Sequence, residues 1–443
     1  MVAAARRLHA HPVRALHGTL EVPGDKSVSH RGVMLSAIAE GTSTIRGFLR
    51  AEDSLATLAA MRQMGVAVDE RADGALIVHG VGMHGLEAPT TTLDLGNSGT
   101  AMRLMTGLLA AQRFDSCLVG DASLMQRPMG RVADPLNRMG ARVATESGRP
   151  PMRITAVEGL HGIELELPVA SAQVKSALLI AGLYARGKTR ITSPGVTRDH
   201  TERMLVSMGV DLAVGQSGRD VAVIGPQSLR ALEITVPGDF SSAAFFIVAG
   251  CLSRGSALRI NNVGVNPTRI GLLEILELMG ARIDVVEMRS AGNEPVADLI
   301  AHPSELKGIE VPERLVALSI DEFPVLFVAA AAARGTTRVH GAEELRHKET
   351  DRLAAMAHAL SSVGVEVNET ADGLEITGGS IAGGCVDSCG DHRVAMAMVV
   401  ASLRAAETIE IANTAQVATS FPSFAEVACS VGFDVSDAKG VPA

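Results

Sequence analysis

One sequence pattern recurs six times along the chain and constrains its fold more than any other feature. Each copy has a hydrophobic residue, a glycine, a further hydrophobic residue and then a stretch of alternating polar and apolar residues. The glycines are Gly65, Gly140, Gly209, Gly280, Gly364 and Gly432. Such a glycine is typical of the end of an amphipathic helix, where it adopts positive φ before a strand begins. Six copies in order predict six related structural units.

A second kind of helix recurs between these copies. It starts at a polar turn, continues through small apolar residues and leads into a strand. The predicted starts are Lys26-Ser27, Asn97-Ser98, Ser171-Ala172, Ser241-Ser242, Asp321-Glu322 and Asp391-His392. Each unit is therefore expected to hold two helices and several strands, which places the chain in the α/β (α+β) class.

A longer duplication divides the six units into two groups of three. The stretch Val22-Pro23-Gly24-Asp25 returns as Val236-Pro237-Gly238-Asp239. We therefore expect two similar domains, residues 24–237 and residues 1–23 with 238–443. The chain would cross between them near Pro23-Gly24 and near Pro237-Gly238. These crossings would form a hinge, with the active site in the cleft between the domains.

Composition excludes several classes of protein. The net charge of −9 argues against a general nucleic-acid binder, and the absence of a run of 18 apolar residues predicts no membrane span. Arg6, Arg7 and Arg14 precede the first acid, but this segment lacks the serine-rich character of a transit peptide. The five cysteines form neither a CxxC pair nor a zinc spacing, which favours free thiols in a reducing cytosol. We expect a cytoplasmic monomer without a bound metal.

Basic residues gather at the predicted helix starts. They are Lys26, Arg31, Arg103, Arg127, Lys175, Arg198, Lys348, Arg352 and Arg393. A helix N-terminus carries unpaired N–H groups and the positive end of the helix dipole, so cations there are mildly unfavourable without an anion. Any one of them could be a solvated surface charge, but their repetition indicates phosphate or carboxylate ligands.

Two acids stand among these cations. Asp321 precedes Glu322-Phe323-Pro324 and could simply be a helix N-cap. Glu349 could simply pair with Arg352 on a helix face. However, Lys348 and Arg352 lie at i and i+4 and can reach one anion together. An acid held beside them is placed for proton transfer near a bound phosphate.

Motifs covering about Leu20 to Phe424 resemble the 5-enolpyruvylshikimate-3-phosphate synthase family. They are Pro23-Gly24-Asp25-Lys26-Ser27-Val28-Ser29-His30-Arg31, Gly96-Asn97-Ser98-Gly99-Thr100, Gly120-Asp121-Ala122-Ser123-Leu124, Arg127-Pro128-Met129, Ser171-Ala172-Gln173-Val174-Lys175-Ser176, Arg198-Asp199-His200-Thr201-Glu202, Asp321-Glu322-Phe323-Pro324, Glu344-Leu345-Arg346-His347-Lys348-Glu349-Thr350-Asp351-Arg352 and Asp391-His392-Arg393. Each motif is moderately specific, and all of them in order are very specific.

The resemblance implies a fold and a reaction. The fold is a pair of domains, each made of three β-α-β-α-β-β units in an inside-out α/β barrel. The reaction belongs to the shikimate pathway, which makes chorismate and the aromatic amino acids. It transfers the carboxyvinyl group of phosphoenolpyruvate to the 5-hydroxyl of shikimate 3-phosphate. Phosphate is released through a non-covalent tetrahedral intermediate, and no metal or organic cofactor is needed.

The resemblance also implies residue roles. The expected ligands of shikimate 3-phosphate are Lys26, Ser27, Arg31, Ser171, Ala172, Gln173, Arg198, Asp321 and Lys348. The expected ligands of phosphoenolpyruvate are Lys26, Asn97, Gly99, Arg127, Gln173, Arg352 and Arg393. Asp321 would be the base for the 5-hydroxyl and Glu349 the acid for the methylene carbon. Lys26 and His392 would support the proton transfers.

The chain departs from the family pattern at three places. Thr419-Ser420 stands before Phe421-Pro422, where many members have Lys, so a phosphoenolpyruvate contact would be missing or supplied elsewhere. Ala172 stands where many members have a second Ser, so its main-chain N–H would make that contact. Ser98 and Leu104 resemble the subgroup that includes glyphosate-tolerant enzymes. Gly99 lacks the methyl group of tolerant members, which predicts a glyphosate target. Gly99 could alternatively serve backbone geometry alone.

Two other functions fit parts of this pattern. The sister enzyme that acts on UDP-N-acetylglucosamine shares the fold but uses a loop cysteine. The nearest candidate here, Cys117, lies in a predicted strand, and we interpret it as a core thiol. A non-catalytic binder of anionic metabolites would not need both Asp321 and Glu349.

Overall fold

The computed structural model describes residues 6–437, which form two compact units. Unit 1 comprises residues 6–23, 237–289 and 295–437, and unit 2 comprises residues 24–236 and 290–294. The chain passes between the units after Pro23 and after Val236. The sequence analysis did not anticipate that residues 290–294 group with unit 2.

The six glycine turns are confirmed. Each glycine has a φ between +85° and +106° and follows a short helix. The helices are α2 (Glu52–Gln63), α4 (Gly130–Arg138), α6 (His200–Ser207), α8 (Gly271–Leu278), α11 (Arg352–Ser362) and α13 (Phe424–Ser430). The strands that follow them are β4 (Val68–Glu70), β8 (Arg142–Glu146), β12 (Leu212–Val214), β17 (Arg282–Ala291), β20 (Glu366–Glu369) and β24 (Asp434–Asp437).

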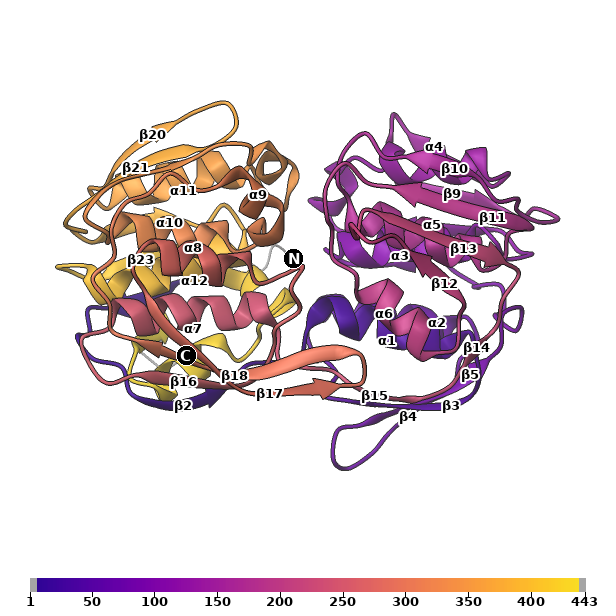
Figure 1. Cartoon of the computed structure of the whole chain (residues 1–443), viewed down its shortest axis with the longest axis horizontal. Coiled ribbons are helices and arrows are strands. Elements are labelled where there is room, and N and C mark those ends of the chain that lie inside the picture. The colour runs from indigo at the N-terminus through magenta and orange to yellow at the C-terminus, as the bar shows by residue number, and fades with distance from the viewer. Residues whose placement is uncertain (1–5, 438–443) are drawn as a thin grey trace. The chain divides into compact units, whose positions relative to one another are not determined.

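Unit 2 contains three sheets and three inner helices (Figure 1). One sheet has the order β6 (Leu93–Asp94), β7 (Ser116–Val119), β9 (Arg149–Thr155), β8. The next has the order β10 (Glu164–Glu166), β11 (Gly187–Thr192), β13 (Asp220–Gly225), β12. The third has the order β14 (Leu229–Arg230), β3 (Ala39–Arg46), β5 (Leu76–Val81), β4, with β15 (Glu233–Thr235) also on β3. The inner helices are α1 (Lys26–Ala37), α3 (Gly99–Leu109) and α5 (Ala172–Gly182).

Unit 1 repeats this plan with strands taken from distant parts of the chain. One sheet has the order β22 (Gly384–Asp387), β23 (Ile409–Ala412), β1 (Leu8–His11), β24. Another has the order β17, β18 (Glu294–His302), β16 (Leu258–Gly264), β2 (Gly18–Glu21). The third has the order β19 (Gly335–Val339), β21 (Leu374–Gly378), β20. The inner helices are α7 (Phe240–Leu252), α10 (Phe323–Ala331) and α12 (His392–Ala401). The N-terminal segment therefore completes two sheets of unit 1.

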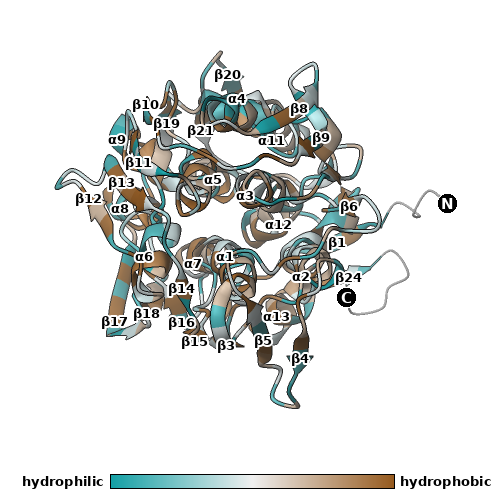
Figure 2. Ribbon diagram, turned by 90° about the vertical axis from the view of Figure 1, so that its right-hand side faces the viewer, coloured by the Kyte–Doolittle hydropathy of each residue, from teal (hydrophilic) through white to brown (hydrophobic). Residues whose placement is uncertain are grey.

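Each unit has its own hydrophobic core, built around its inner helices. Every residue of α7 and α10 is buried, as expected for helices that are apolar on all sides. Apolar segments run along the inner helices in Figure 2. Sheets therefore lie outside the helices, which is the inside-out arrangement. Burying the helices fixes where their N-terminal ends, with their polar residues, are placed.

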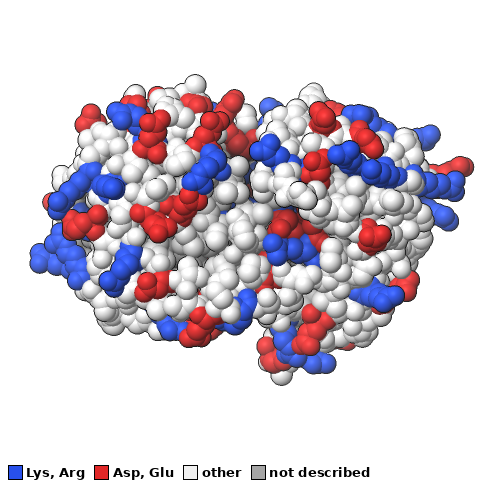
Figure 3. Space-filling view, in the orientation of Figure 1, with Lys and Arg blue, Asp and Glu red and all other residues white. Residues whose placement is uncertain are grey.

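Three properties of the described residues bear on function. No helix there is long and apolar enough to cross a membrane. All five cysteines are free thiols. Acidic and basic side chains are interspersed over the face drawn in Figure 3.

Candidate active site

Asp321 lies at the centre of a charged group in unit 1. Its Oδ1 is 3.3 Å from Lys348 Nζ and 3.3 Å from Arg352 Nη1. Arg393 Nη1 donates a 2.9 Å hydrogen bond to the main-chain oxygen of Asp321. The prediction that Lys348 and Arg352 reach one anion together is confirmed, and that anion belongs to the protein itself.

Asp321 is not the N-cap of α10. The helix begins at Phe323, and its N-cap is Glu322, which makes no side-chain capping bond. The interpretation of Asp321 as the helix N-cap was therefore wrong. Its carboxylate instead faces two cations and keeps 14 % of its surface exposed, so a substrate hydroxyl can approach it.

Glu349 pairs with Arg352, as the sequence spacing allowed. Its Oε2 lies 2.5 Å from Arg352 Nη2. The expectation that this pair lies on a helix face was wrong, because Glu349 is in a bend and α11 begins only at Arg352. The bend leaves the Glu349 side chain 20 % exposed.

Arg352 is surrounded by carboxylates. Besides Asp321 and Glu349, it donates through Nε to Asp391 Oδ2 at 2.8 Å. Burial would lower the pKa of Arg352, but the charges of Asp391, Glu349 and Asp321 raise it above its ordinary value. Three protein carboxylates therefore already pair with Arg352 in this structure.

Asp391 also orders the start of α12. Its Oδ1 accepts from the Arg393 main-chain N–H at 2.8 Å, so it serves as the N-cap. His392 is the first residue of the helix and is 3 % exposed. Asp391 and Arg393 thus link the start of α12 to Arg352 and to Asp321.

In unit 2, the start of α1 holds Lys26, Ser27 and Arg31. Lys26 Nζ lies 2.6 Å from Asp53 Oδ2. Arg31 is 3 % exposed and donates to Thr201 Oγ1, Ser176 Oγ and the Ser27 main-chain oxygen. These are all neutral acceptors.

Arg31 is therefore a buried cation whose hydrogen-bond acceptors, among the described residues, are all neutral. Burial, together with the nearby charge of Arg198, lowers the pKa of Arg31 to about 10 despite the opposing charges of Glu202 and Asp25. It remains charged at neutral pH. An approaching anion would give Arg31 a charged acceptor.

Gly99 lies between two guanidinium groups at the start of α3. A Cβ at this position would be 2.9 Å from Arg103 Nη1 and 2.9 Å from Arg127 Nη1. Gly99 does not have a positive φ, so no left-handed backbone conformation calls for a glycine at this position. Its lack of a side chain instead makes room for both cations.

Neutral amides hold these cations in place. Arg127 donates to Asn97 Oδ1 at 2.7 Å, and Arg103 donates to Gln173 Oε1 at 2.7 Å. Gln173 donates in turn to Thr100 Oγ1 at 2.9 Å. Four of the predicted phosphoenolpyruvate ligands, Asn97, Gly99, Arg127 and Gln173, are thus brought together. Arg103 was predicted only as a basic residue near a helix start, without a role in the site.

The start of α5 presents a capping hydroxyl and main-chain N–H groups. Ser171 is the N-cap, and its hydroxyl accepts from the Val174 main-chain N–H at 3.3 Å. Ala172 is the first residue of the helix, where main-chain N–H groups have no partner within the helix. Lys175, in contrast, does not face solvent at this helix start. It is 2 % exposed, and its Nζ lies 2.5 Å from Glu202 Oε1, so the two residues form a buried ion pair.

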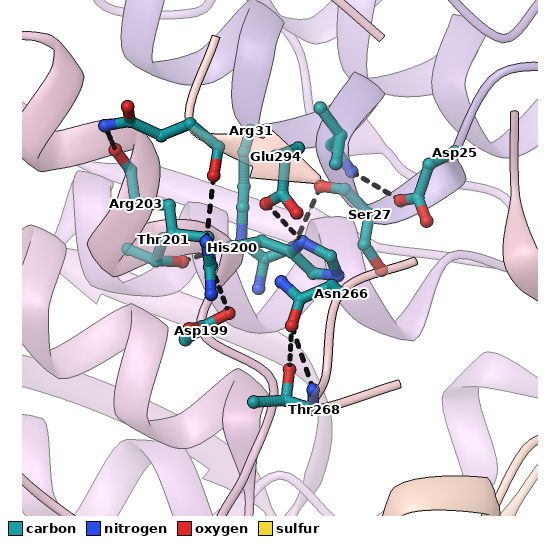
Figure 4. A network of polar contacts seen from close by, with 12 residues as sticks. Asp25, Ser27, Arg31, Asp199, His200, Thr201, Arg203, Asn266, Thr268 and Glu294 are labelled. Atoms are coloured by element: carbon teal, nitrogen blue, oxygen red, sulfur yellow. Dashed lines mark hydrogen bonds and ion pairs between the residues drawn. The ribbon is translucent and has the colours of Figure 1, made fainter. Parts of the chain in front are cut away.

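The motif Arg198-Asp199-His200-Thr201 opens α6. Thr201 binds Arg31, and His200 Nδ1 lies 2.7 Å from Glu294 Oε1, with both side chains at most 10 % exposed (Figure 4). Glu294 comes from the tip of the β17–β18 hairpin. Nothing near Glu294 in the sequence marks it as the partner of His200, so this contact was not predicted.

Two further expectations can be compared with the structure. Thr419 is 3 % exposed and donates to the Gln416 main-chain oxygen at 2.7 Å, so its hydroxyl is already engaged. Cys117 lies in strand β7, as predicted, but it is half-buried and faces away from the core. The interpretation of Cys117 as a core thiol was wrong.

Among residues 6–437, no group of three or more His, Cys, Asp or Glu side chains could hold a metal ion.

Comparison with known proteins shows which family this chain is similar to. The family model described as EPSP synthase (3-phosphoshikimate 1-carboxyvinyltransferase) matches residues 10–428. The chain is 54% identical over 427 residues to the 3-phosphoshikimate 1-carboxyvinyltransferase of Methylococcus capsulatus, covering 96% of this chain and 97% of that one. It is 55% identical over 436 residues to that of Alkalilimnicola ehrlichii, with 98% and 97% covered. The solved EPSP synthase of Acinetobacter baumannii has a TM-score of 0.87 and 49% identity, with 97% and 100% covered.

Proposed function

Because the chain belongs to the EPSP synthase family, we propose that it is a 3-phosphoshikimate 1-carboxyvinyltransferase of the shikimate pathway. It transfers the carboxyvinyl group of phosphoenolpyruvate to the 5-hydroxyl of shikimate 3-phosphate and releases phosphate. The observation that carries this proposal is the group of two partly exposed acids, Asp321 and Glu349, both held by the buried cation Arg352. No observation favours UDP-N-acetylglucosamine as the acceptor.

The reaction needs two proton transfers. In the addition step, Asp321 takes the proton of the 5-hydroxyl, whose oxygen bonds to C2 of phosphoenolpyruvate. Glu349 gives a proton to C3, which completes the tetrahedral intermediate. In the elimination step, the bond from C2 to the phosphate oxygen breaks and C3 loses a proton, which restores the double bond. Lys26 and His392 support these transfers. The steps call for neither a metal nor an organic cofactor.

Substrate binding divides between two sets of residues. Those proposed for shikimate 3-phosphate are Lys26, Ser27, Arg31, Ser171, Ala172, Gln173, Arg198, Asp321 and Lys348. Those proposed for phosphoenolpyruvate are Lys26, Asn97, Gly99, Arg127, Gln173, Arg352 and Arg393. The neutral acceptors of the buried Arg31 guanidinium support an anion site at the start of α1. We further propose two domains with hinges at the crossings, a monomer, and a cytoplasmic location, which the free cysteines support.

Phosphate release in the presence of both substrates tests the proposal. Purified protein should release inorganic phosphate only when shikimate 3-phosphate and phosphoenolpyruvate are both present. Replacing shikimate 3-phosphate with UDP-N-acetylglucosamine should abolish release. Binding of both substrates without phosphate release would identify a non-catalytic binder instead.

A further inference from the structure

A buried polar network lies directly behind Asp321 in unit 1. The next residue, Glu322, has a side chain that is fully buried. Its Oε1 is hydrogen-bonded to the Ser241 hydroxyl and lies 3.9 Å from Arg269 Nη2. Arg269 also donates to Ser241 Oγ at 2.7 Å and lies 3.4 Å from Asp239 Oδ1. Three segments far apart in the sequence therefore meet at one carboxylate.

This network costs stability. The second carboxylate oxygen of Glu322, Oε2, is buried without a hydrogen-bond partner. A buried acceptor left unpaired costs about 1–3 kcal/mol, and an apolar side chain of similar volume often stabilises such a site. Packing alone therefore gives no reason for a carboxylate at this position, which leaves a role in positioning.

The main chain connects this network to the proposed base. Glu322 is the N-cap of α10, and its main-chain N–H donates to the Ser319 oxygen at 2.9 Å. Successive residues in a helical turn point about 100° apart. When the Glu322 side chain is fixed in the interior, the neighbouring Asp321 must leave the turn in another direction. In this structure that direction leads to Lys348 and Arg352.

The main-chain oxygen of Asp321 is fixed as well. Arg393 donates to its main-chain oxygen at 2.9 Å. Glu322 and Arg393 thus restrain the peptide group that joins Asp321 to α10. A base must lie within hydrogen-bond reach of the proton that it removes, and a displacement of about 1 Å can cost roughly 100-fold in rate.

We propose that Glu322 is the positioning residue for Asp321. Held by Ser241 and Arg269, its carboxylate sets the turn from which the base projects. This inference rests on the proposed function, in which Asp321 accepts the proton of the 5-hydroxyl. The side chain of Glu322 is fully buried, so it acts through its neighbour.

The test compares Glu322→Gln with the wild type. This change keeps the size of the side chain but removes its charge. We expect kcat to fall about 10- to 100-fold while the KM values of both substrates stay within about threefold. The matched control is Asp298→Asn, which replaces another buried acid of unit 1 that pairs with Arg259 and Arg289. The control should keep its kcat even if its thermal stability falls.

A double-mutant cycle separates positioning from general damage. In an Asp321→Asn background, Glu322→Gln should have little further effect, because the group that it positions is gone. Additive losses, a kcat within twofold of wild type, or a rise in KM alone would overturn the inference. If Glu322→Gln does not fold, Ser241→Ala should show the same non-additivity with a smaller loss. Failure of the wild type to release phosphate would instead overturn the proposed function.

Discussion

Asp321 Oδ1 lies 3.3 Å from Arg352 Nη1, although 31 residues separate them in the chain. The contact holds a partly exposed carboxylate against a buried cation. A proposed base is thus fixed in position and accessible. The same guanidinium binds Glu349, so both proposed proton-transfer groups share one anchor.

Removing either acid should lower turnover far more than it weakens substrate binding. For Asp321→Asn and for Glu349→Gln we expect kcat to fall about 100- to 10,000-fold, the range for general acid–base groups. Binding of shikimate 3-phosphate, measured by calorimetry, should change much less. An exposed acid such as Glu313→Gln serves as the control. Near-normal turnover in either variant would show that its assigned role is wrong.

Arg31 should contribute to binding rather than to chemistry. Arg31→Met removes a buried cation whose partners are all neutral oxygens. We expect the affinity for shikimate 3-phosphate to fall at least about tenfold, since a hydrogen bond to a charged group contributes about 1.5–3 kcal/mol. The affinity should be measured by calorimetry without phosphoenolpyruvate. An unchanged affinity would place the phosphate elsewhere.

Gly99→Ala should separate glyphosate from phosphoenolpyruvate. The new methyl group would lie 2.9 Å from the ends of Arg103 and Arg127, and these flexible side chains would have to shift. We expect glyphosate to inhibit the wild type competitively with phosphoenolpyruvate. The variant should lose about 5- to 150-fold in glyphosate affinity and less in its KM for phosphoenolpyruvate.

Inhibition constants for the two forms decide this prediction. Because the φ of Gly99 is not positive, the variant should fold normally, and its thermal midpoint serves as the control. A wild type that resists millimolar glyphosate would show that another position governs tolerance. Leu104 and Thr419 would then be tested first.

His30 should make the fold sensitive to acid. Burial, followed by the charges of Lys26 and Arg31, holds the pKa of His30 well below its ordinary value of 6.5. The unfolded chain therefore binds the proton more readily, so the stability is complete above about pH 6.5 and is lost as the pH falls toward the folded pKa. The free energy of unfolding should fall more between pH 7.5 and 5.5 for the wild type than for His30→Gln. Equal losses would contradict this account.

Activity should not depend on an added metal. We expect phosphate release to continue at an unchanged rate after treatment with a chelator and removal of the chelated ion. Loss of activity that a divalent cation restores would refute the proposed cofactor-free reaction.

Local patterns determined much of this protein. The six glycine turns depend on a helix end and a positive φ, both of which are set within a few residues. Lys348, Glu349 and Arg352 also lie close in the sequence, so the pairing of Glu349 with Arg352 and the approach of both cations to one anion could be anticipated. Apolar segments on all sides of α7 and α10 likewise follow from composition.

Only the tertiary structure decided which distant groups meet. Nothing local shows that Glu294 reaches His200, or that Arg269 lies behind Glu322. The sequence also could not show that Arg31 has only neutral acceptors. The physical reason is that hydrophobic burial of the inner helices places their ends together, whereas the polar contacts at those ends depend on side-chain geometry across long chain separations.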